Sequence, residues 1–118
     1  MSSVPFSSQL RSQAGSAVID LYGEINALAD NQLSAVFEQA MADQPQTVVL
    51  NFSQVSYINS TGIALIVGLL AEARKNHCRL VVFGLSDHYT EIFNITRLSD
   101  FMTIYTDETS ALQDVSRV

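Results

Sequence analysis

The residues best placed for chemistry are two hydroxyls at the start of an apolar helix. Asn59-Ser60-Thr61-Gly62 comes directly before the run Ile63 to Ala71, in which nearly every residue is apolar. A serine at such a position can cap the helix by accepting a hydrogen bond from a free amide. It can also act as a nucleophile, or lie on a surface that a partner covers.

Enzymatic use of Ser60 lacks the companions that it would need. The Gly-x-Ser-x-Gly motif of many hydrolases is absent, and neither His77 nor His88 is evidently placed to activate Ser60. The segment also lacks the further glycines and the lysine of a phosphate-binding loop. His77, Cys78 and His88 show none of the paired spacings of zinc ligands. We therefore expect no enzymatic activity, no cofactor and no metal.

The helix after Ser60 favours a docking surface over a plain cap. Serine is among the commonest N-cap residues, so a cap made by Ser60 or Thr61 is the simpler interpretation. However, the expected helix from Ser60 to Lys75 has almost no polar side chain before Glu72. A small domain cannot easily bury such a helix on all sides, so we expect a partner to cover part of it.

Length and composition indicate one small domain that binds proteins. The chain has 118 residues, of which 47% are apolar and 15% are charged, with a net charge of −6. This length suits a single domain over residues 1–118, in which we expect residues 1–5 to be flexible. The negative charge and the lack of a basic stripe argue against nucleic acid.

Nothing in the sequence indicates export or membrane insertion. Cys78 is the only cysteine, so the chain cannot close an internal disulfide. The N-terminus lacks a basic region and a long apolar run. The stretch Ile63 to Ala71 is far shorter than the roughly 20 residues that span a bilayer. We expect a cytoplasmic protein that is monomeric when free.

Apolar periodicity predicts the N-terminal elements. Strands over Phe6–Ser12 and Ser16–Tyr22 form a hairpin, with a turn at Ala14-Gly15. Gly23–Asn26 is expected to end the second strand, and Asn26 to cap an amphipathic helix. The residues expected on the apolar stripe of that helix are Leu33, Val36, Phe37, Ala40 and Met41.

Strands and helices alternate after this point. The expected order is a strand at Thr47–Phe52, a loop at Ser53–Asn59, the helix at Ser60–Lys75, a strand at Arg79–Phe83, a helix at Asp87–Ile95, a strand at Phe101–Tyr105 and a terminal helix. This alternation predicts an α/β fold with a mixed, mostly parallel sheet of about five strands and about four helices.

Three motifs in order resemble the STAS domain family, and within it the stand-alone anti-sigma factor antagonists. Gly23-Glu24-Ile25-Asn26 is similar to the family's Gly-Glu-Leu-Asp, and Asn51-Phe52-Ser53-Gln54-Val55 to its Asp-Leu-Ser-x-Val. Asn59-Ser60-Thr61-Gly62 is similar to its Asp-Ser-Ser/Thr-Gly. The similarity covers nearly the whole chain.

The resemblance implies a protein-interaction switch. In that family an anti-sigma factor kinase phosphorylates the serine before Ser/Thr-Gly, which is Ser60 here. The unphosphorylated protein binds the kinase and frees the sigma factor, and a phosphatase resets it. The partner-binding residues expected from this are Asn26, Tyr57, Asn59, Ser60, Thr61, Gly62 and Ile63.

Three residues depart from the family pattern. Asn51 and Asn59 stand where the family often has Asp, and Arg97 stands where it commonly has Gly. If the kinase uses a carboxylate at position 59, phosphorylation of Ser60 is slow or absent. Arginine tolerates a positive φ less well than glycine, so the turn at Arg97 is expected to differ. The alternative is a STAS subunit of a transporter or larger sensory assembly, without phosphorylation of Ser60.

Overall fold

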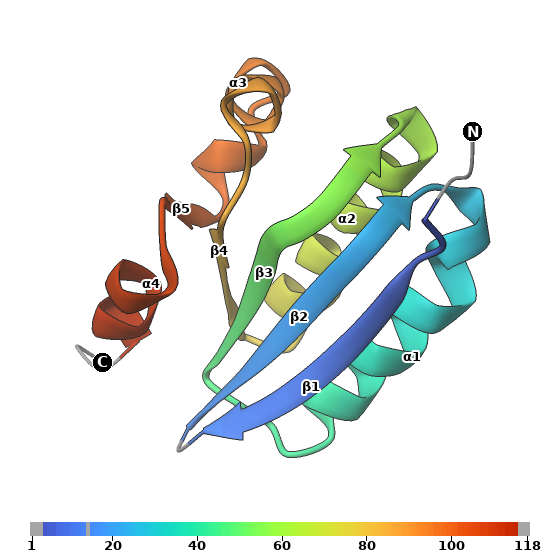
Figure 1. The fold of residues 1–118 in the computed structure, drawn as a ribbon. Helices are drawn as coiled ribbons and strands as arrows, with labels where there is room; N and C mark the ends of the chain where they lie inside the picture. The colour runs from blue at the N-terminus through green and yellow to red at the C-terminus, as the bar shows by residue number, and fades with distance from the viewer. Residues whose placement is uncertain (1–3, 14, 116–118) are drawn as a thin grey trace.

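A five-stranded sheet forms the centre of the computed structural model, which describes residues 4–13 and 15–115 (Figure 1). Its strands, in spatial order, are β1 (Ser7–Gln13), β2 (Ser16–Ile25), β3 (Thr47–Ile58), β4 (Arg79–Phe83) and β5 (Thr103–Tyr105). β1 and β2 form an antiparallel hairpin, and each later neighbouring pair is parallel. The predicted single α/β domain with a mixed, mostly parallel sheet is confirmed.

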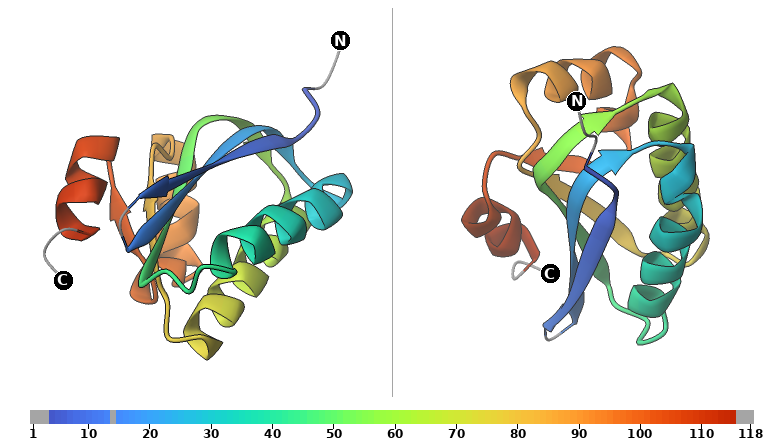
Figure 2. Two further views of the ribbon diagram at one scale, coloured as in Figure 1. Left: turned by 90° about the horizontal axis from the view of Figure 1, so that it is seen from below. Right: turned by 45° about the vertical axis from the view of Figure 1, so that its right-hand side comes forward.

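Helices cover both faces of this sheet (Figure 2). The α-helices are α1 (Asp30–Met41), α2 (Ser60–Lys75), α3 (Asp87–Ile95) and α4 (Glu108–Val115). Two short 3₁₀ segments, η1 (Ala27–Ala29) and η2 (Leu98–Asp100), complete the described elements. α1 and α2 lie side by side against one face, and α4 lies on the other.

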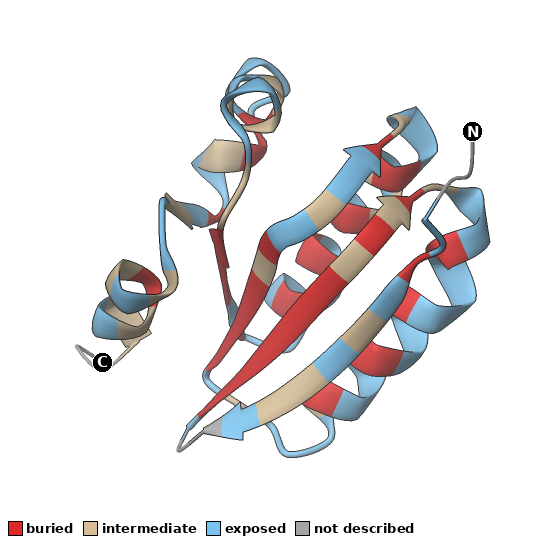
Figure 3. Ribbon diagram, in the orientation of Figure 1, coloured by how far each residue is buried: buried red, intermediate tan, exposed pale blue. Residues whose placement is uncertain are grey.

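β2 is buried along most of its length (Figure 3), because its two faces pack into two different cores. Ile19 and Leu21 point into the larger core, which α1 and α2 cover. These two helices contribute Leu33, Phe37, Ile66 and Leu69, among other residues. Val18 points to the opposite face, where a smaller cluster packs under Ala111 of α4. The stripe predicted for α1 is confirmed, because Leu33, Val36, Phe37 and Ala40 are all buried.

The predicted ends of the second and third strands, at Tyr22 and Phe52, are wrong. β2 continues through Gly23 to Ile25, and β3 continues through the expected loop to Ile58. The two strands stay paired along this stretch because register irregularities absorb the extra residues. Gly23 lies at one of them with φ +80°, a backbone conformation that glycine adopts at little cost.

The N-terminal residues were expected to be flexible. Of residues 1–5, residues 1–3 lie outside the part of the chain that the structure describes. The Val4 carbonyl accepts a 3.0 Å hydrogen bond from the Glu24 amide. Within residues 4–13 and 15–115, no helix is both long enough and apolar enough to cross a membrane.

Candidate functional site

The carboxyl ends of β2 and β3 bring two of the predicted motifs together. Ile25 pairs with Ile58 at the end of these strands, and the Asn59 amide donates a 3.2 Å hydrogen bond to the Ile25 carbonyl. The segments that follow, starting at Asn26 and at Ser60, therefore leave the sheet from the same edge. Residues far apart in the sequence thus share one surface.

Asn59, and not Ser60, caps α2. The Asn59 backbone is extended, with φ −93° and ψ −178°, and its Oδ1 accepts a 2.8 Å hydrogen bond from the Gly62 amide. The expectation that the Ser60 or Thr61 hydroxyl makes this cap is wrong. An N-cap needs non-helical backbone angles, and Ser60 is already the first residue of the helix.

The Ser60 side chain is consequently free of a structural role. Ser60 and Thr61 are exposed at the first turn of α2. Among the residues that the structure describes, none forms a hydrogen bond with the Ser60 hydroxyl. This hydroxyl is therefore open to an incoming reagent, next to the free amides and the positive dipole end of a helix.

Gly62 sets how closely α2 approaches the sheet. It is buried, and a Cβ atom at this position would overlap the carbonyl oxygen of Ile25. A side chain here would push the start of α2 away from β2. Gly62 therefore belongs to the site as a backbone element beneath its surface.

Three of the elements that meet near Ser60, which are η1, β3 and α2, carry exposed apolar side chains. Tyr57, at the end of β3, is 52% exposed, and Val67, two turns into α2, is 44% exposed. Leu28 in η1 is 88% exposed, and its amide donates to Asn26 Oδ1 at 2.9 Å. Leu28 was not among the residues expected at the site; it precedes α1 and lies outside the apolar stripe of that helix. We use the name docking face for the following residues on these elements: Asn26, Leu28, Tyr57, Ser60, Thr61, Ile63 and Val67.

Tyr89 connects α3 to the same site. Its hydroxyl accepts a 2.8 Å hydrogen bond from the Ile58 amide and lies 3.3 Å from the Ile58 carbonyl, to which it can donate. β4 pairs with β3 only as far as Asn51, so Ile58 has no strand neighbour on that side. Tyr89 is half-buried, and its hydroxyl pairs with both backbone polar groups of Ile58.

Comparison with known proteins assigns the family. The STAS domain family matches residues 7–111. The chain belongs to the STAS domain family. The anti-sigma-B factor antagonist of Listeria monocytogenes is 34% identical to this STAS domain over 88 residues, which cover 73% of this chain and 77% of the relative.

Solved structures share the fold. The Bacillus cell fate determinant SpoIIAA in its phosphorylated form matches with a TM-score of 0.72 and 26% identity, over 92% of this chain and 99% of SpoIIAA. A sulfate transporter family protein from Wolinella succinogenes matches with a TM-score of 0.78 at 17% identity, over 88% and 87% of the two chains. STAS anti-sigma factor antagonists are regulatory binding proteins and not enzymes.

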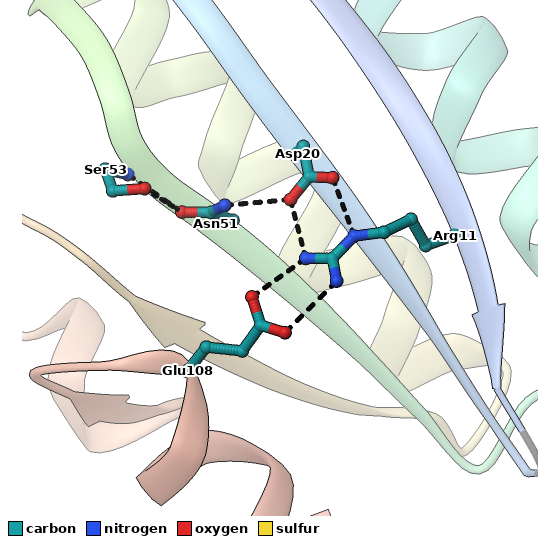
Figure 4. A network of polar contacts seen from close by, with 5 residues as sticks. All are labelled: Arg11, Asp20, Asn51, Ser53 and Glu108. Carbon is teal, nitrogen blue, oxygen red and sulfur yellow. Dashed lines mark hydrogen bonds and ion pairs between the residues drawn. The ribbon is translucent and has the colours of Figure 1, made fainter.

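A polar network on the α4 face of the STAS domain includes the first departure from the family pattern (Figure 4). Arg11 contacts Asp20 at 2.7 Å and Glu108 at 2.9 Å, and so joins β1 and β2 to α4. Asn51 Nδ2 donates to Asp20 Oδ1 at 2.8 Å, and Asn51 Oδ1 accepts from the Ser53 amide at 2.9 Å. An aspartate at position 51 could not donate to Asp20, so the amide suits this neighbour.

Asp20 is buried although it carries a charged side chain. It is 6% exposed, because β1 and α4 lie on either side of it. Burial by itself raises the pKa of Asp20, but hydrogen bonds from Arg11 and Asn51 and the Arg11 charge outweigh this effect. The pKa of Asp20 therefore lies below its ordinary value.

The third departure leaves the backbone turn intact. Arg97 has φ +68° and ψ +13°, the left-handed conformation that a glycine would adopt readily. Its Nε lies 2.6 Å from Asp100 Oδ2. The STAS domain thus keeps a positive-φ turn here, at the cost of placing a side chain in a sterically disfavoured region.

Proposed function

We propose that this STAS domain is an anti-sigma factor antagonist controlled at Ser60. In its unphosphorylated state it binds an anti-sigma factor of the serine kinase type in the cytoplasm, and phosphorylation of Ser60 releases it. A cognate phosphatase restores the binding form. The observation that carries the proposal is the exposed, uncommitted Ser60 hydroxyl at the start of α2. The name of the Listeria relative and the phosphorylated SpoIIAA structure support it.

The domain itself should tolerate a phosphate at Ser60. A phosphoserine adds about −1.5 to −2 charges at neutral pH. Those charges would meet the first-turn amides and the positive end of the α2 dipole. Asn59 contributes an amide where an aspartate would repel the phosphate. Its Nδ2 makes no hydrogen bond within the described residues.

The effect of the phosphate must therefore arise at the interface. Tyr57, three residues before Ser60 on β3, and Val67, seven residues after it on α2, both expose apolar surface. A dianion in the middle of this docking face would have to lose its hydration when the partner binds. It would also repel acidic groups of the partner. Release thus follows from desolvation and repulsion, without a change of fold.

Two neighbouring positions on α2 test the docking face. Val67 is 44% exposed, whereas Ile66 is 1% exposed. We expect Val67→Glu to weaken partner binding about tenfold or more while the domain stays folded. Ile66→Glu should unfold the domain, because it buries an unpaired charge. Unchanged partner affinity in the folded Val67→Glu variant would remove this face from the proposal.

The modification itself is tested with the kinase-type anti-sigma factor and Mg-ATP, followed by peptide mass spectrometry. We expect one phosphate, located on Ser60. Thr61→Ala serves as the matched control, because Thr61 is the exposed hydroxyl next to Ser60. Modification should persist in Thr61→Ala and be lost in Ser60→Ala. A phosphate on Thr61 instead would contradict the assignment.

A subunit of a transporter or of a larger sensory assembly is the second candidate. Asn59, in place of the family's aspartate, favours it, since a kinase that needs a carboxylate there would not modify Ser60. Affinity capture of the tagged chain from its native cells separates the candidates. Recovery of a transporter subunit, together with no phosphorylation of Ser60, would support the second.

A further inference from the structure

A groove runs between α1 and α2 on the side away from the sheet. It has a volume of about 490 Å³ and is lined only by residues of these two helices and by Asn76, which directly follows α2. Its apolar lining includes Leu33, Phe37, Leu65 and Leu69. Leu33 and Phe37 also belong to the main core, so the groove reaches down to that core.

The groove exists because α2 lacks side-chain volume on two successive turns. Ala64 and Gly68 are four residues apart, so they lie on the same face of the helix, and both are exposed. A Cβ atom at Gly68 would meet nothing within 4 Å. The apolar floor is therefore left open to another element.

Acidic side chains line this groove without basic ones. Asp30, Glu38 and Glu72 are all exposed there, and no lysine or arginine is among the lining residues. Within residues 4–13 and 15–115, no salt bridge involves any of the three carboxylates. They are therefore available to cations from outside the domain.

Four of the five lysines and arginines that the structure describes are engaged elsewhere, and only the exposed Lys75 makes no ion pair or ring contact. Arg11, Arg79 and Arg97 form ion pairs with carboxylates outside the groove. Arg74 stacks over the Phe101 ring at 5.2 Å from its centroid. A second copy of this chain would bring a net charge of −6 and, from its described residues, one unpaired lysine. An anionic lipid surface would be repelled for the same reason.

We propose that the α1–α2 groove binds a basic amphipathic helix of a partner protein. Apolar residues spaced by three and four would pack on the floor, where Ala64 and Gly68 allow close approach. Lysines and arginines beside them would pair with Asp30, Glu38 and Glu72. On the α2 side the groove begins at Ala64 and does not include Ser60, so the proposal does not rest on phosphorylation of Ser60.

The probe is a fluorescent helical peptide of about 18 residues, built from leucine and lysine at amphipathic spacing. A peptide with glutamate in place of lysine is the control. Polarisation titrations with the full-length chain should show binding of the lysine peptide only, weakened by added salt. Glu38→Lys and Glu72→Lys should each lower the affinity about tenfold. Glu91→Lys, an exposed position on α3 outside the groove, should leave it unchanged.

The Gly68→Leu variant tests whether the peptide needs the groove itself or only the negative charge of the surface. It fills open space, keeps every carboxylate and replaces glycine with a better helix former, so the fold should persist. Binding should fall about tenfold or more. Full binding by Gly68→Leu, or an equal loss in Glu91→Lys, would show non-specific attraction and overturn the proposal. Sedimentation showing a dimer that Gly68→Leu disrupts would identify a second copy as the occupant and overturn it as well.

Discussion

Asn59 and Gly62 form the hydrogen bond that defines the start of α2. Asn59 Oδ1 lies 2.8 Å from the Gly62 amide, and the intervening Ser60 side chain is exposed. The cap at this helix start thus belongs to Asn59, and the adjacent Ser60 is left free for the proposed modification. Phosphorylation of Ser60 would not have to break the cap that holds the helix.

This assignment of the cap predicts different stabilities for two alanine variants. Asn59→Ala should lower the free energy of unfolding by about 1 kcal/mol, because the Gly62 amide loses its partner. Ser60→Ala should change it by less than about 0.5 kcal/mol, as for an ordinary surface residue. Urea denaturation of both variants measures the difference. Equal destabilisation would mean that Ser60 also carries the cap.

Asn51→Asp tests the departure from the family pattern. The substitution removes the donor to Asp20 and places two carboxylates together in a part-buried site. We expect a loss of about 1–3 kcal/mol at pH 7, measured by urea denaturation. The double variant Asn51→Asp with Asp20→Asn restores one donor opposite one acceptor and should recover part of the loss. No recovery would show that the cost arises elsewhere.

The lowered pKa of Asp20 predicts acid sensitivity of a definite sign. Asp20 ionises more readily when folded than when unfolded, so its contribution is complete above the unfolded value of about 3.9. That contribution is lost as the pH falls through the folded pKa. Asp20→Asn should therefore flatten the dependence of unfolding free energy on pH below about 5. Parallel curves for the parent and the variant would contradict this.

Arg97→Gly should stabilise the protein. Arg97 holds a left-handed conformation that costs a non-glycine residue about 1–2 kcal/mol. Glycine removes this strain but has more freedom to lose on folding and forfeits an exposed ion pair. The net gain should be about 0.5–1 kcal/mol in thermal or urea unfolding. Arg97→Ala keeps the strain and loses the pair, so it should not stabilise.

Regular apolar patterns allowed several elements to be placed from the sequence. α2, β4 and α3 have the expected bounds, since each apolar run ends at a clear polar or glycine boundary. The strands predicted for β2 and β3 are shorter than the observed ones, because residues near their ends, such as Glu24 and Ser56, are polar. The ends of the two strands extend the sheet by pairing with each other across register irregularities, which no local pattern reveals.

The candidate site could be located from the sequence but not assembled. Ser60 was identified because its motif precedes an apolar helix. The choice of Asn59 as the cap depends on backbone angles that residue types do not specify. The burial of Asp20 could not be foreseen, because Glu108, which binds the same Arg11, lies 97 residues from Arg11 and only the tertiary fold brings α4 over this site.

We expect a phosphate on Ser60 to control partner binding without altering the fold. Calorimetric titration of the kinase-type anti-sigma factor with unmodified and enzymatically phosphorylated protein tests it most directly. Phosphorylation should lower the affinity tenfold or more, on the order of 1.4 kcal/mol. Ser60→Asp should follow in the same direction, and Ser60→Ala should bind like the parent. The melting temperature of the phosphorylated protein should stay close to that of the unmodified one. Equal affinities of the phosphorylated and unmodified proteins would contradict the claim.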